Sequence, residues 1–409
     1  MDNTVFIIGA VWVEPNSSAA GSRMLQLIEY FQAQGSKIVF GTTAHRNENS
    51  IDLKLLGIET HNLRLNDTSF DALLLEINPS IVLFDRYITE EQFGWRVAEK
   101  LPSVVRVLDT EDLHCLRKVR EKQYKSGNVF RTSDLLNDEI TKREIAAILR
   151  SDLSLIISKF EMNLLLEIFQ IHPSILLYLP FLLGKSVAAQ NVPAFGDRRD
   201  FISIGNFLHA PNLDSVITLK KSIWPKIRKE LPEANLHIYG AYPTQQIKDF
   251  HKPNAGIFVH GFVENQHEVL RNAKVLLAPL SFGAGLKGKF LDGMLNGCPS
   301  VTTSIGIEGY ADEENWCGEV SNEWNDFTDK AIALYRNESS WNQAQRNGFE
   351  LLRQFDKTEH ESEFTSKLNS IFTDLDNHRN HNFMGSLLLH HRLKSTKYLS
   401  KWIEEKNKA

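Results

Sequence analysis

Short apolar runs rich in β-branched residues alternate with amphipathic helical stretches along most of the chain. The pattern begins with a strand at 4–11, a helix at 23–34 and a strand at 37–42, and begins again at 201–204. Alternation of this kind is typical of parallel sheets with helices on both faces. A chain of 409 residues also exceeds one ordinary core. We therefore predict an α/β protein with two facing Rossmann-like domains and a central cleft.

Changes in composition mark the predicted domain boundaries. Residues 184–199 mix Gly, Pro and charge without a period, as linkers do. We predict an N-terminal domain at 1–183, this linker, a C-terminal domain at 200–350 and a helical tail at 351–409. The end of the tail, 377–409, carries seven Lys/Arg against two Glu among many apolar residues. We expect it to pack back across the domains, and a membrane-surface helix is the alternative.

Charge and cysteine content exclude several classes of protein. The net charge of −5 argues against a broad nucleic-acid-binding surface. Cys115, Cys298 and Cys317 are scattered and form no CxxC motif, which favours a reducing compartment and argues against zinc. The N-terminal apolar run follows no basic segment, so we interpret it as a strand rather than a signal peptide. We expect a cytoplasmic protein without a metal and without a membrane-spanning helix.

One stretch, residues 277–309, predicts an anion-binding site. An apolar run is followed by a turn with Gly283 and Gly285, and then by a helix that carries Lys287 and Lys289. A helix N-terminus offers free N–H groups, glycine lets a phosphate approach the backbone, and lysine adds charge. Because the two lysines are two positions apart on a helix, we expect only one, Lys287, to reach a diphosphate. The alternative for each lysine is an ordinary surface position.

The same region resembles a known enzyme family. The segments FISIGNFLHAPNLDSV, HGFVEN, EVLRNAKVLLAPL and FGAGLKGKFLDGMLNGCPSVTTSIGIEGY occur in the order and spacing of the donor-binding domain of GT-B glycosyltransferases. The chain is similar to the family-four retaining enzymes (glycosyl transferases group 1) over about residues 4–350, and its motif resembles a GAGxKGK subset. The resemblance implies a nucleoside-diphosphate sugar as donor substrate and no required cofactor.

Two departures from the family pattern affect the expected donor site. The wider family has two acidic residues eight positions apart, and here Asp292 takes the second place while Ala284 stands at the first. The family also tends to place a cation after the first donor-domain strand, where this chain has Asn206. The resemblance assigns Asp292 to the donor ribose. The candidate donor-binding residues are Asn206, Gly283, Ala284, Gly285, Leu286, Lys287, Lys289, Asp292 and Glu308.

Polar residues at two predicted strand ends form the candidate acceptor side. The run DTEDLH contains Asp109, Asp112 and His114, and it follows a strand at 104–108. A His–Asp pair could orient an acceptor hydroxyl or take its proton, because histidine titrates near neutral pH; a structural histidine is the alternative. The candidate catalytic residues are His114, Asp112 and Lys287. The loop after the first strand adds Ser18, Gly21 and Arg23 to the acceptor side.

These expectations combine into one predicted activity. The chain is predicted to move a sugar from a nucleotide sugar to a glycan, lipid-linked or other hydroxyl acceptor, with retention, in polysaccharide or glycoconjugate synthesis. The expected partners are the nucleotide sugar and the acceptor, with peripheral contact at the inner face of the membrane as an open alternative and no nucleic acid. Two other functions stay open: a nucleotide-sugar-binding protein that has lost catalysis, and a nucleotide-sugar epimerase. A dinucleotide oxidoreductase is disfavoured because residues 9–14 lack GxGxxG.

Overall fold

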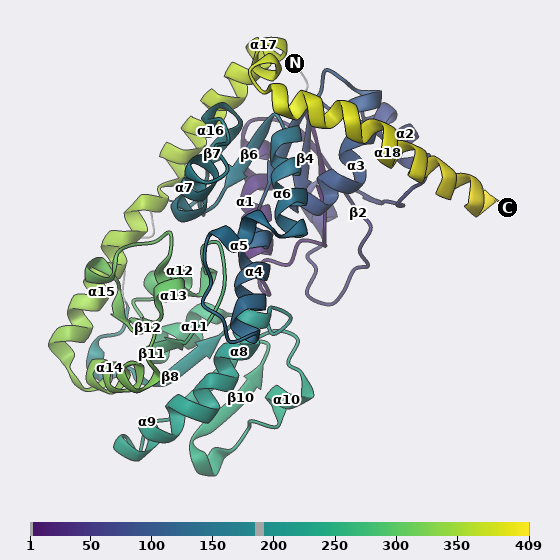
Figure 1. The fold of residues 1–409 in the computed structure, drawn as a ribbon. Coiled ribbons are helices and arrows are strands. Elements are labelled where there is room, and N and C mark those ends of the chain that lie inside the picture. The colour runs from purple at the N-terminus through teal and green to yellow at the C-terminus, as the bar shows by residue number, and fades with distance from the viewer. Residues whose placement is uncertain (1–2, 185–191, 409) are drawn as a thin grey trace.

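A computed structural model describes residues 3–184 and 192–408 (Figure 1). Its N-terminal part contains a seven-stranded sheet in the order β3-β2-β1-β4-β5-β6-β7, and every neighbouring pair of strands is parallel. The strands are β1 (Thr4–Gly9), β2 (Lys37–Thr42), β3 (Glu59–Asn62), β4 (Ile81–Asp85), β5 (Val105–Asp109), β6 (Leu153–Ile156) and β7 (Leu176–Tyr178).

A second parallel sheet of six strands follows, in the order β10-β9-β8-β11-β12-β13. Both sheets reverse their strand order beside their first strand, between β1 and β4 and between β8 and β11. Ligands of open parallel sheets bind outside the carboxyl ends of the strands at such switch points. The strands are β8 (Arg199–Ile204), β9 (Leu236–Tyr239), β10 (Ile257–Gly261), β11 (Ala273–Ala278), β12 (Ser300–Thr302) and β13 (Gly318–Val320).

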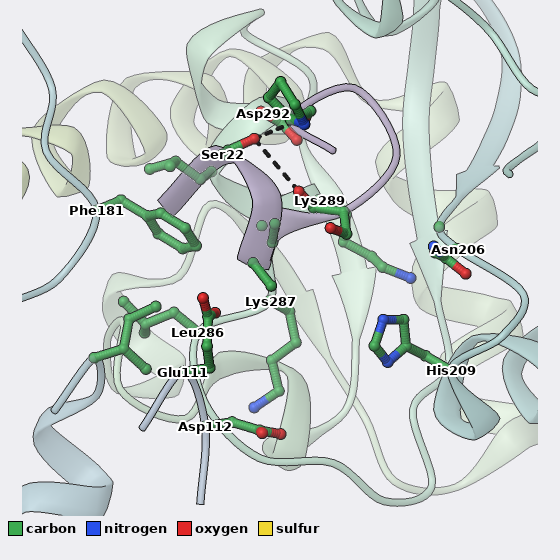
Figure 2. A pocket seen from close by; sticks show the side chains of 18 of the residues that line it. Ser22, Glu111, Asp112, Phe181, Asn206, His209, Leu286, Lys287, Lys289 and Asp292 are labelled. Atoms are coloured by element: carbon green, nitrogen blue, oxygen red, sulfur yellow. Dashed lines mark hydrogen bonds between the residues drawn. The ribbon is translucent and has the colours of Figure 1, made fainter. Parts of the chain in front are cut away.

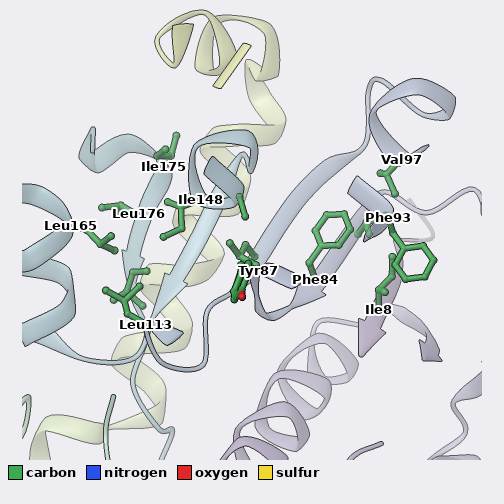
Figure 3. Close-up of a cluster of buried hydrophobic side chains, with 14 of the residues drawn as sticks. Ile8, Phe84, Tyr87, Phe93, Val97, Leu113, Ile148, Leu165, Ile175 and Leu176 are labelled. Atoms are coloured by element: carbon green, nitrogen blue, oxygen red, sulfur yellow. The ribbon is translucent and has the colours of Figure 1, made fainter. Parts of the chain in front are cut away.

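Helices cover both faces of each sheet because alternate strand residues point to opposite faces. In β1, Phe6 and Ile8 join one buried cluster, whereas Val5 and Ile7 join the other. Figure 3 shows the first of these clusters. In the N-terminal domain the helices are α1 (Ala19–Ala33), α2 (Ser69–Ile77), α3 (Arg86–Lys100), α4 (His114–Lys125), α5 (Ser133–Leu136), α6 (Glu139–Arg150) and α7 (Lys159–Glu167).

The second sheet is covered in the same way. Phe201 of β8 joins one buried cluster, and its neighbour Ile202 joins the cluster on the other face. The helices are α8 (Ala210–Thr218), α9 (Trp224–Glu230), α10 (Gln245–Lys248), α11 (Gln266–Asn272), α12 (Gly288–Leu295), α13 (Ser304–Ile307), α14 (Trp324–Arg336) and α15 (Glu338–Leu352).

The chain crosses between the two sheets at two places that lie side by side. Leu183 donates its N–H to the Phe355 carbonyl, and the Lys357 N–H donates to the Leu183 carbonyl. After the second crossing, α16 (Lys357–Thr373) returns to the N-terminal domain, where Phe364 and Leu368 enter its core. Then α17 (Leu375–Asn380) and α18 (Phe383–Lys408) follow, and α18 packs on α3 and α6 (Figure 1). Of the predicted linker, residues 185–191 lie outside the described residues.

Two local expectations differ from the structure. The first helix begins at Ala19 rather than at residue 23, because the Ser18 hydroxyl caps it by accepting from the Gly21 N–H. The edge strand β3 reads ETHN, with no apolar residue, so the sequence pattern did not indicate a strand there. Neither difference moves the carboxyl ends of the strands that carry the candidate site.

Candidate active site between the two domains

A cavity of about 710 Å³ lies between the two sheets at their switch points. Its walls come from the loops that follow β1, β4 and β5 in the N-terminal domain and β8 and β11 in the C-terminal domain. This volume falls in the range that binds small molecules in proteins. The loop after β11 is the glycine- and lysine-containing stretch singled out in the sequence.

Both lysines of that stretch line the cavity (Figure 2). That only Lys287 reaches a diphosphate stays a prediction, but its basis in helical spacing does not hold. Lys287 is not a helical residue: it precedes α12 as its N-cap, with an extended backbone (φ −84°, ψ 99°). Helical periodicity therefore does not separate its side chain from that of Lys289 in the first turn. The N-terminal end of α12 and two ammonium groups thus face one space.

The two ammonium groups differ in their partners. The Lys287 Nζ atom is buried and has no hydrogen-bond partner among the described residues. The Lys289 Nζ atom donates to Asn212 Oδ1 at 2.8 Å. Burial lowers the pKa of each lysine to about 8, so the charged form is costly in the empty cavity. A bound anion would remove that cost.

Asp292 also lines the cavity, one turn further along α12. Burial raises the pKa of its carboxyl group to about 7, although a hydrogen bond with the Gln266 side chain partly opposes the rise. Near neutral pH the group is therefore present in both protonation states, and it can accept hydrogen bonds from ligand hydroxyl groups.

The glycine turn is held by side chains from the other domain. Glu161 of α7 accepts from the Gly285 N–H at 2.8 Å and from the Leu113 N–H at 2.9 Å. Arg120 of α4 donates to the Gly283 carbonyl at 2.9 Å and forms a two-point ion pair with Glu308, with both N···O distances 2.7 Å. Gly285 and Glu308 consequently connect the domains and are not among the residues that line the cavity.

Gly283, Ala284 and Leu286 do line the cavity. The Ala284 methyl group packs against the core of the N-terminal domain. At Gly285 the backbone is left-handed (φ 63°), and an added Cβ atom would lie 2.8 Å from the Asp112 Cβ atom. The turn therefore approaches the facing loop closely because residues 283–285 have small or no side chains.

On the facing wall, Asp112 holds His114 and Arg117. Its carboxylate accepts from Arg117 at 2.6 and 3.2 Å and lies 3.2 Å from the His114 Nε2 atom. Burial opposes the charge of Asp112, but Arg117 and His114 outweigh it and keep the pKa of Asp112 well below its usual range. Burial lowers the pKa of His114 to about 4. This value differs from the expectation that His114 titrates near neutral pH, because burial disfavours the charged ring.

The other acceptor-side candidates have structural contacts. Arg23 and Asp109 form a buried ion pair, with 2.8 Å between Arg23 Nη2 and Asp109 Oδ1, and Arg23 also donates to the Leu179 carbonyl. Gly21 packs against the Glu14 backbone. None of these three residues lines the cavity, whereas Ser18 and Asn206 do. Asn206 joins the domains because its amide nitrogen donates to the Ser17 carbonyl at 3.2 Å.

Sequence reasoning missed several residues of the cavity wall: Arg86, Glu111, Arg117 and His209. Arg86 and Glu111 have left-handed backbones, with φ of 70° and 63°, which is uncommon for side chains of this size. Figure 2 shows His209 beside Asn206, opposite Lys289. The one sequence signal was position: Arg86 directly follows a strand, and Glu111 lies within the DTEDLH run.

Two classes of site are not found in the described residues. No group of three His, Cys, Asp or Glu is arranged to hold a metal ion within 3–184 and 192–408. In the same part of the chain, no helix combines the length and the apolar character needed to cross a bilayer.

Comparisons with known proteins connect this architecture to one class of enzyme. Residues 198–337 match the family model described as glycosyl transferases group 1. No curated protein sequence matches the chain significantly.

Among solved structures, sucrose-phosphate synthase from Thermosynechococcus elongatus is 13% identical with a TM-score of 0.69, and the match covers 91% of this chain and 99% of that one. HepE of Anabaena, solved with UDP and glucose, is 10% identical with a TM-score of 0.64 and coverage of 90% and 99%. WaaG, a glycosyltransferase involved in lipopolysaccharide biosynthesis, is 12% identical with a TM-score of 0.61 and coverage of 88% and 98%.

At 10–13% identity the solved structures establish only the shared fold. The family model identifies the second domain as similar to glycosyl transferases group 1. Two facing parallel sheets, a cavity at both switch points and a family match over the second sheet agree with one another. The protein is a glycosyltransferase of the GT-B fold whose residues 198–337 form a glycosyl transferases group 1 domain.

Proposed function

We propose that the interdomain cavity binds a nucleoside-diphosphate sugar and that the enzyme transfers its sugar to a hydroxyl acceptor with retention. The observation that carries the proposal is the pair of lysines at the N-terminal end of α12, because the buried Nζ atom of Lys287 has no hydrogen-bond partner among the described residues. A departing nucleoside diphosphate is an anion that ammonium groups and a helix N-terminus stabilise. Asp292 is proposed to accept hydrogen bonds from the ribose hydroxyl groups.

The side chains on the cavity wall that faces the lysines limit which group can take the proton of the acceptor hydroxyl. His114 is neutral with a pKa of about 4, and Asp112 is a weak base because it pairs with Arg117. The oxygen of the departing diphosphate is then the better proton acceptor. In the proposed reaction the C1–O bond to the diphosphate breaks, the acceptor oxygen bonds to C1 from the same face, and its proton passes to the diphosphate. Attack from that face gives retention.

Known complexes suggest which donors to test first. HepE has been solved with UDP and glucose and, separately, with UDP-glucose. A panel of UDP-glucose, UDP-galactose, UDP-N-acetylglucosamine and GDP-mannose would be assayed for transfer and for slow hydrolysis, with wild type and Lys287→Ala. We expect one donor to release its nucleoside diphosphate with wild type, and release about 10²-fold slower with the variant. No turnover and no binding of any sugar nucleotide would refute the proposal.

The two rival functions would give different products from the proposed sugar transfer. A protein that has lost catalysis would bind a sugar nucleotide without releasing the nucleoside diphosphate to any acceptor or to water. An epimerase would interconvert two sugar nucleotides. We place transfer first because residues 198–337 match the glycosyl transferases group 1 family model. Chromatography of the reaction mixture separates the three outcomes.

The tail helix favours a peripheral membrane contact, which suits a lipid-linked acceptor. Polar residues of α18 hold it to the N-terminal domain: Lys397 pairs with Glu99 at 2.9 Å, Ser400 binds Arg96 at 3.1 Å, and Glu404 pairs with Arg96. Six of its large apolar side chains are exposed. The exposed ones are Phe383 (71% exposed), Met384, Leu387, Tyr398 (66%), Leu399 and Trp402 (61%).

The charge of this helix indicates an anionic lipid surface as its partner. Residues 383–408 contain six Lys/Arg against two Glu, in a chain of net charge −5. Aromatic rings beside lysines are typical of helices that lie in a membrane interface. Vesicle sedimentation would test the contact: we expect binding to phosphatidylglycerol-containing vesicles, weaker binding to pure phosphatidylcholine, and loss of both in Phe383→Ser/Trp402→Ser. Equal sedimentation of wild type and this variant would contradict it.

A further inference from the structure

We propose that Glu111 is a sugar-specificity residue whose carboxyl group binds hydroxyl groups of the transferred sugar. The inference rests on the proposed function and adds a residue that the sequence did not single out. Three observations carry it: the backbone at Glu111, the missing partner of its carboxyl group, and its position between the lysines and the apolar wall.

The backbone turns Glu111 toward the cavity. Its neighbours in the loop after β5 are engaged elsewhere: Asp109 pairs with Arg23 in the interior, and Asp112 pairs with Arg117. Between them, Glu111 has a left-handed φ of 63° and lines the cavity. This conformation is unfavourable for a residue with a long side chain, and such strain persists where the surroundings hold it, often at functional sites.

The carboxyl group lacks a partner. Glu111 is 9% exposed, yet no hydrogen bond or ion pair reaches its carboxyl oxygens from the described residues. Two other acids of the cavity wall, both of intermediate exposure, differ, since Asp112 binds Arg117 and Asp292 binds Gln266. Buried polar groups in folded proteins are nearly always hydrogen-bonded. A carboxyl group without a hydrogen-bond partner among the described residues, at the wall of a binding cavity, offers its hydrogen bonds to a ligand.

The acidic groups around Glu111 disfavour an anionic ligand group beside its carboxyl group. Burial, followed by the charges of Asp109 and Asp85, raises its pKa well above the usual value, although Arg86 and Arg23 oppose the rise. A raised pKa favours the protonated form of the carboxyl group, which can both donate to and accept from a hydroxyl group. An anion would be drawn to Lys287 and Lys289 instead.

Its position fits a sugar ring. In Figure 2, Glu111 lies beside Leu286 and near Phe181, while Lys289 and His209 lie on the other side of Lys287. The Glu111 carbonyl also faces the glycine turn, 3.6 Å from where a Cβ atom on Gly285 would be. Apolar side chains suit the C–H faces of a sugar, and one polar group among them fixes its orientation. A sugar attached to a diphosphate at Lys287 would reach this wall.

Calorimetry with two variants tests the proposal. Glu111→Gly removes the carboxyl group and also relieves the left-handed strain, so we expect it to melt at the wild-type temperature or higher. Glu111→Ala is the second variant. For the donor that wild type binds best, each should weaken binding of the sugar nucleotide about tenfold and leave the affinity for the corresponding nucleoside diphosphate unchanged. Glu76→Ala, at an exposed position of α2 outside the cavity lining, is the control.

The outcomes separate this inference from the proposed function. If wild type binds neither UDP nor GDP nor any of their sugar conjugates, both fail. If wild type binds them but Glu111→Gly binds the sugar nucleotide as tightly as wild type, the assignment of Glu111 alone is overturned. An equal loss of affinity for the sugar nucleotide and for the nucleoside diphosphate would also overturn it, because the effect would not arise at the sugar.

Discussion

Lys287 has a buried ammonium group without a hydrogen-bond partner among the described residues, and Glu308, Arg120 and Glu161 surround it at longer range. A buried charge without a partner destabilises the empty protein, and a ligand of opposite charge reverses that effect. The residue therefore contributes binding free energy at some cost to stability. Because Lys287 favours ligand binding but disfavours folding of the empty protein, two predictions about single residues follow.

The first concerns thermal unfolding. Lys287→Ala should leave the melting temperature of the ligand-free protein unchanged or raise it, and should remove most of the increase caused by UDP or GDP, whichever wild type binds. Differential scanning fluorimetry with and without the nucleotide measures both effects. Lys248→Ala, an exposed lysine of α10, should behave as wild type. A variant that melts lower when empty and keeps the full nucleotide shift would contradict this account.

The second concerns pH. With pKa values of about 8, Lys287 and Lys289 lose their protons as pH rises through 8, so sugar-nucleotide affinity should fall between pH 7 and 9.5. The stability effect has the opposite sign. A folded-state pKa below the unfolded value of about 10.4 gives a penalty that is complete below pH 8 and disappears as pH rises toward 10. Titration calorimetry at pH 7 and at pH 9.5 would measure the loss of sugar-nucleotide affinity. Lys287→Arg, which stays charged, should weaken the pH dependence of that affinity.

Residues outside regular elements were the least predictable from sequence. The glycines and lysines of the donor loop were recognisable because their spacing is informative by itself. Asp109 was predicted for the acceptor side but pairs with Arg23 in the interior, whereas Glu111 lines the cavity. Strand alternation alone cannot show that a left-handed residue turns the loop after β5. The partner of the glycine turn, Glu161, comes from a helix more than a hundred residues earlier, and no local pattern indicates it.

At the scale of elements, α7 fixes the turn that precedes α12. Glu161 accepts from two backbone N–H groups, one in each domain, while its second oxygen has no partner in the described residues. Burial, followed by the charge of Asp112, raises the pKa of Glu161 to about 8. The side chain is therefore protonated at neutral pH, and a neutral amide of the same shape should replace it.

We thus predict that Glu161→Gln retains near-normal stability and nucleotide affinity. Glu161→Ala leaves two buried N–H groups unpaired, which should cost about 2 kcal/mol of unfolding free energy and reduce nucleotide affinity. Stability from the protonated side chain is complete below pH 4.5 and declines as pH rises through 8. Urea unfolding of the three proteins at pH 7 measures the difference. Equal losses for the Gln and Ala variants would show that a charged carboxylate is needed.

At the scale of the whole molecule, the two domains are joined by more than their connecting chain. Arg120, from the N-terminal domain, is 6% exposed and binds both Glu308 and the Gly283 carbonyl of the other domain. The paired crossings at Leu183 and Lys357 form a second junction. The general two-domain plan followed from the alternating pattern, but these contacts did not, because they depend on how the domains sit together.

Removing this ion pair should loosen the closed arrangement. Arg120→Ala leaves Glu308 and a carbonyl unpaired, which should destabilise the protein by about 3 kcal/mol and increase the radius of gyration in small-angle X-ray scattering. Arg46→Ala removes an exposed pair with Asp52 and should change neither quantity measurably. An Arg120→Ala protein with wild-type scattering and stability would show that the junction does not hold the domains together.

The central claim is that the interdomain cavity binds the diphosphate of a sugar donor through Lys287 and Lys289. Isothermal titration calorimetry of the UDP- and GDP-sugar panel into wild type, Lys287→Ala and Lys287→Ala/Lys289→Ala tests it most directly. We predict micromolar to millimolar binding of at least one donor to wild type, at least tenfold weaker binding to the single variant, and none to the double variant. Equal affinity in all three folded proteins would contradict the account.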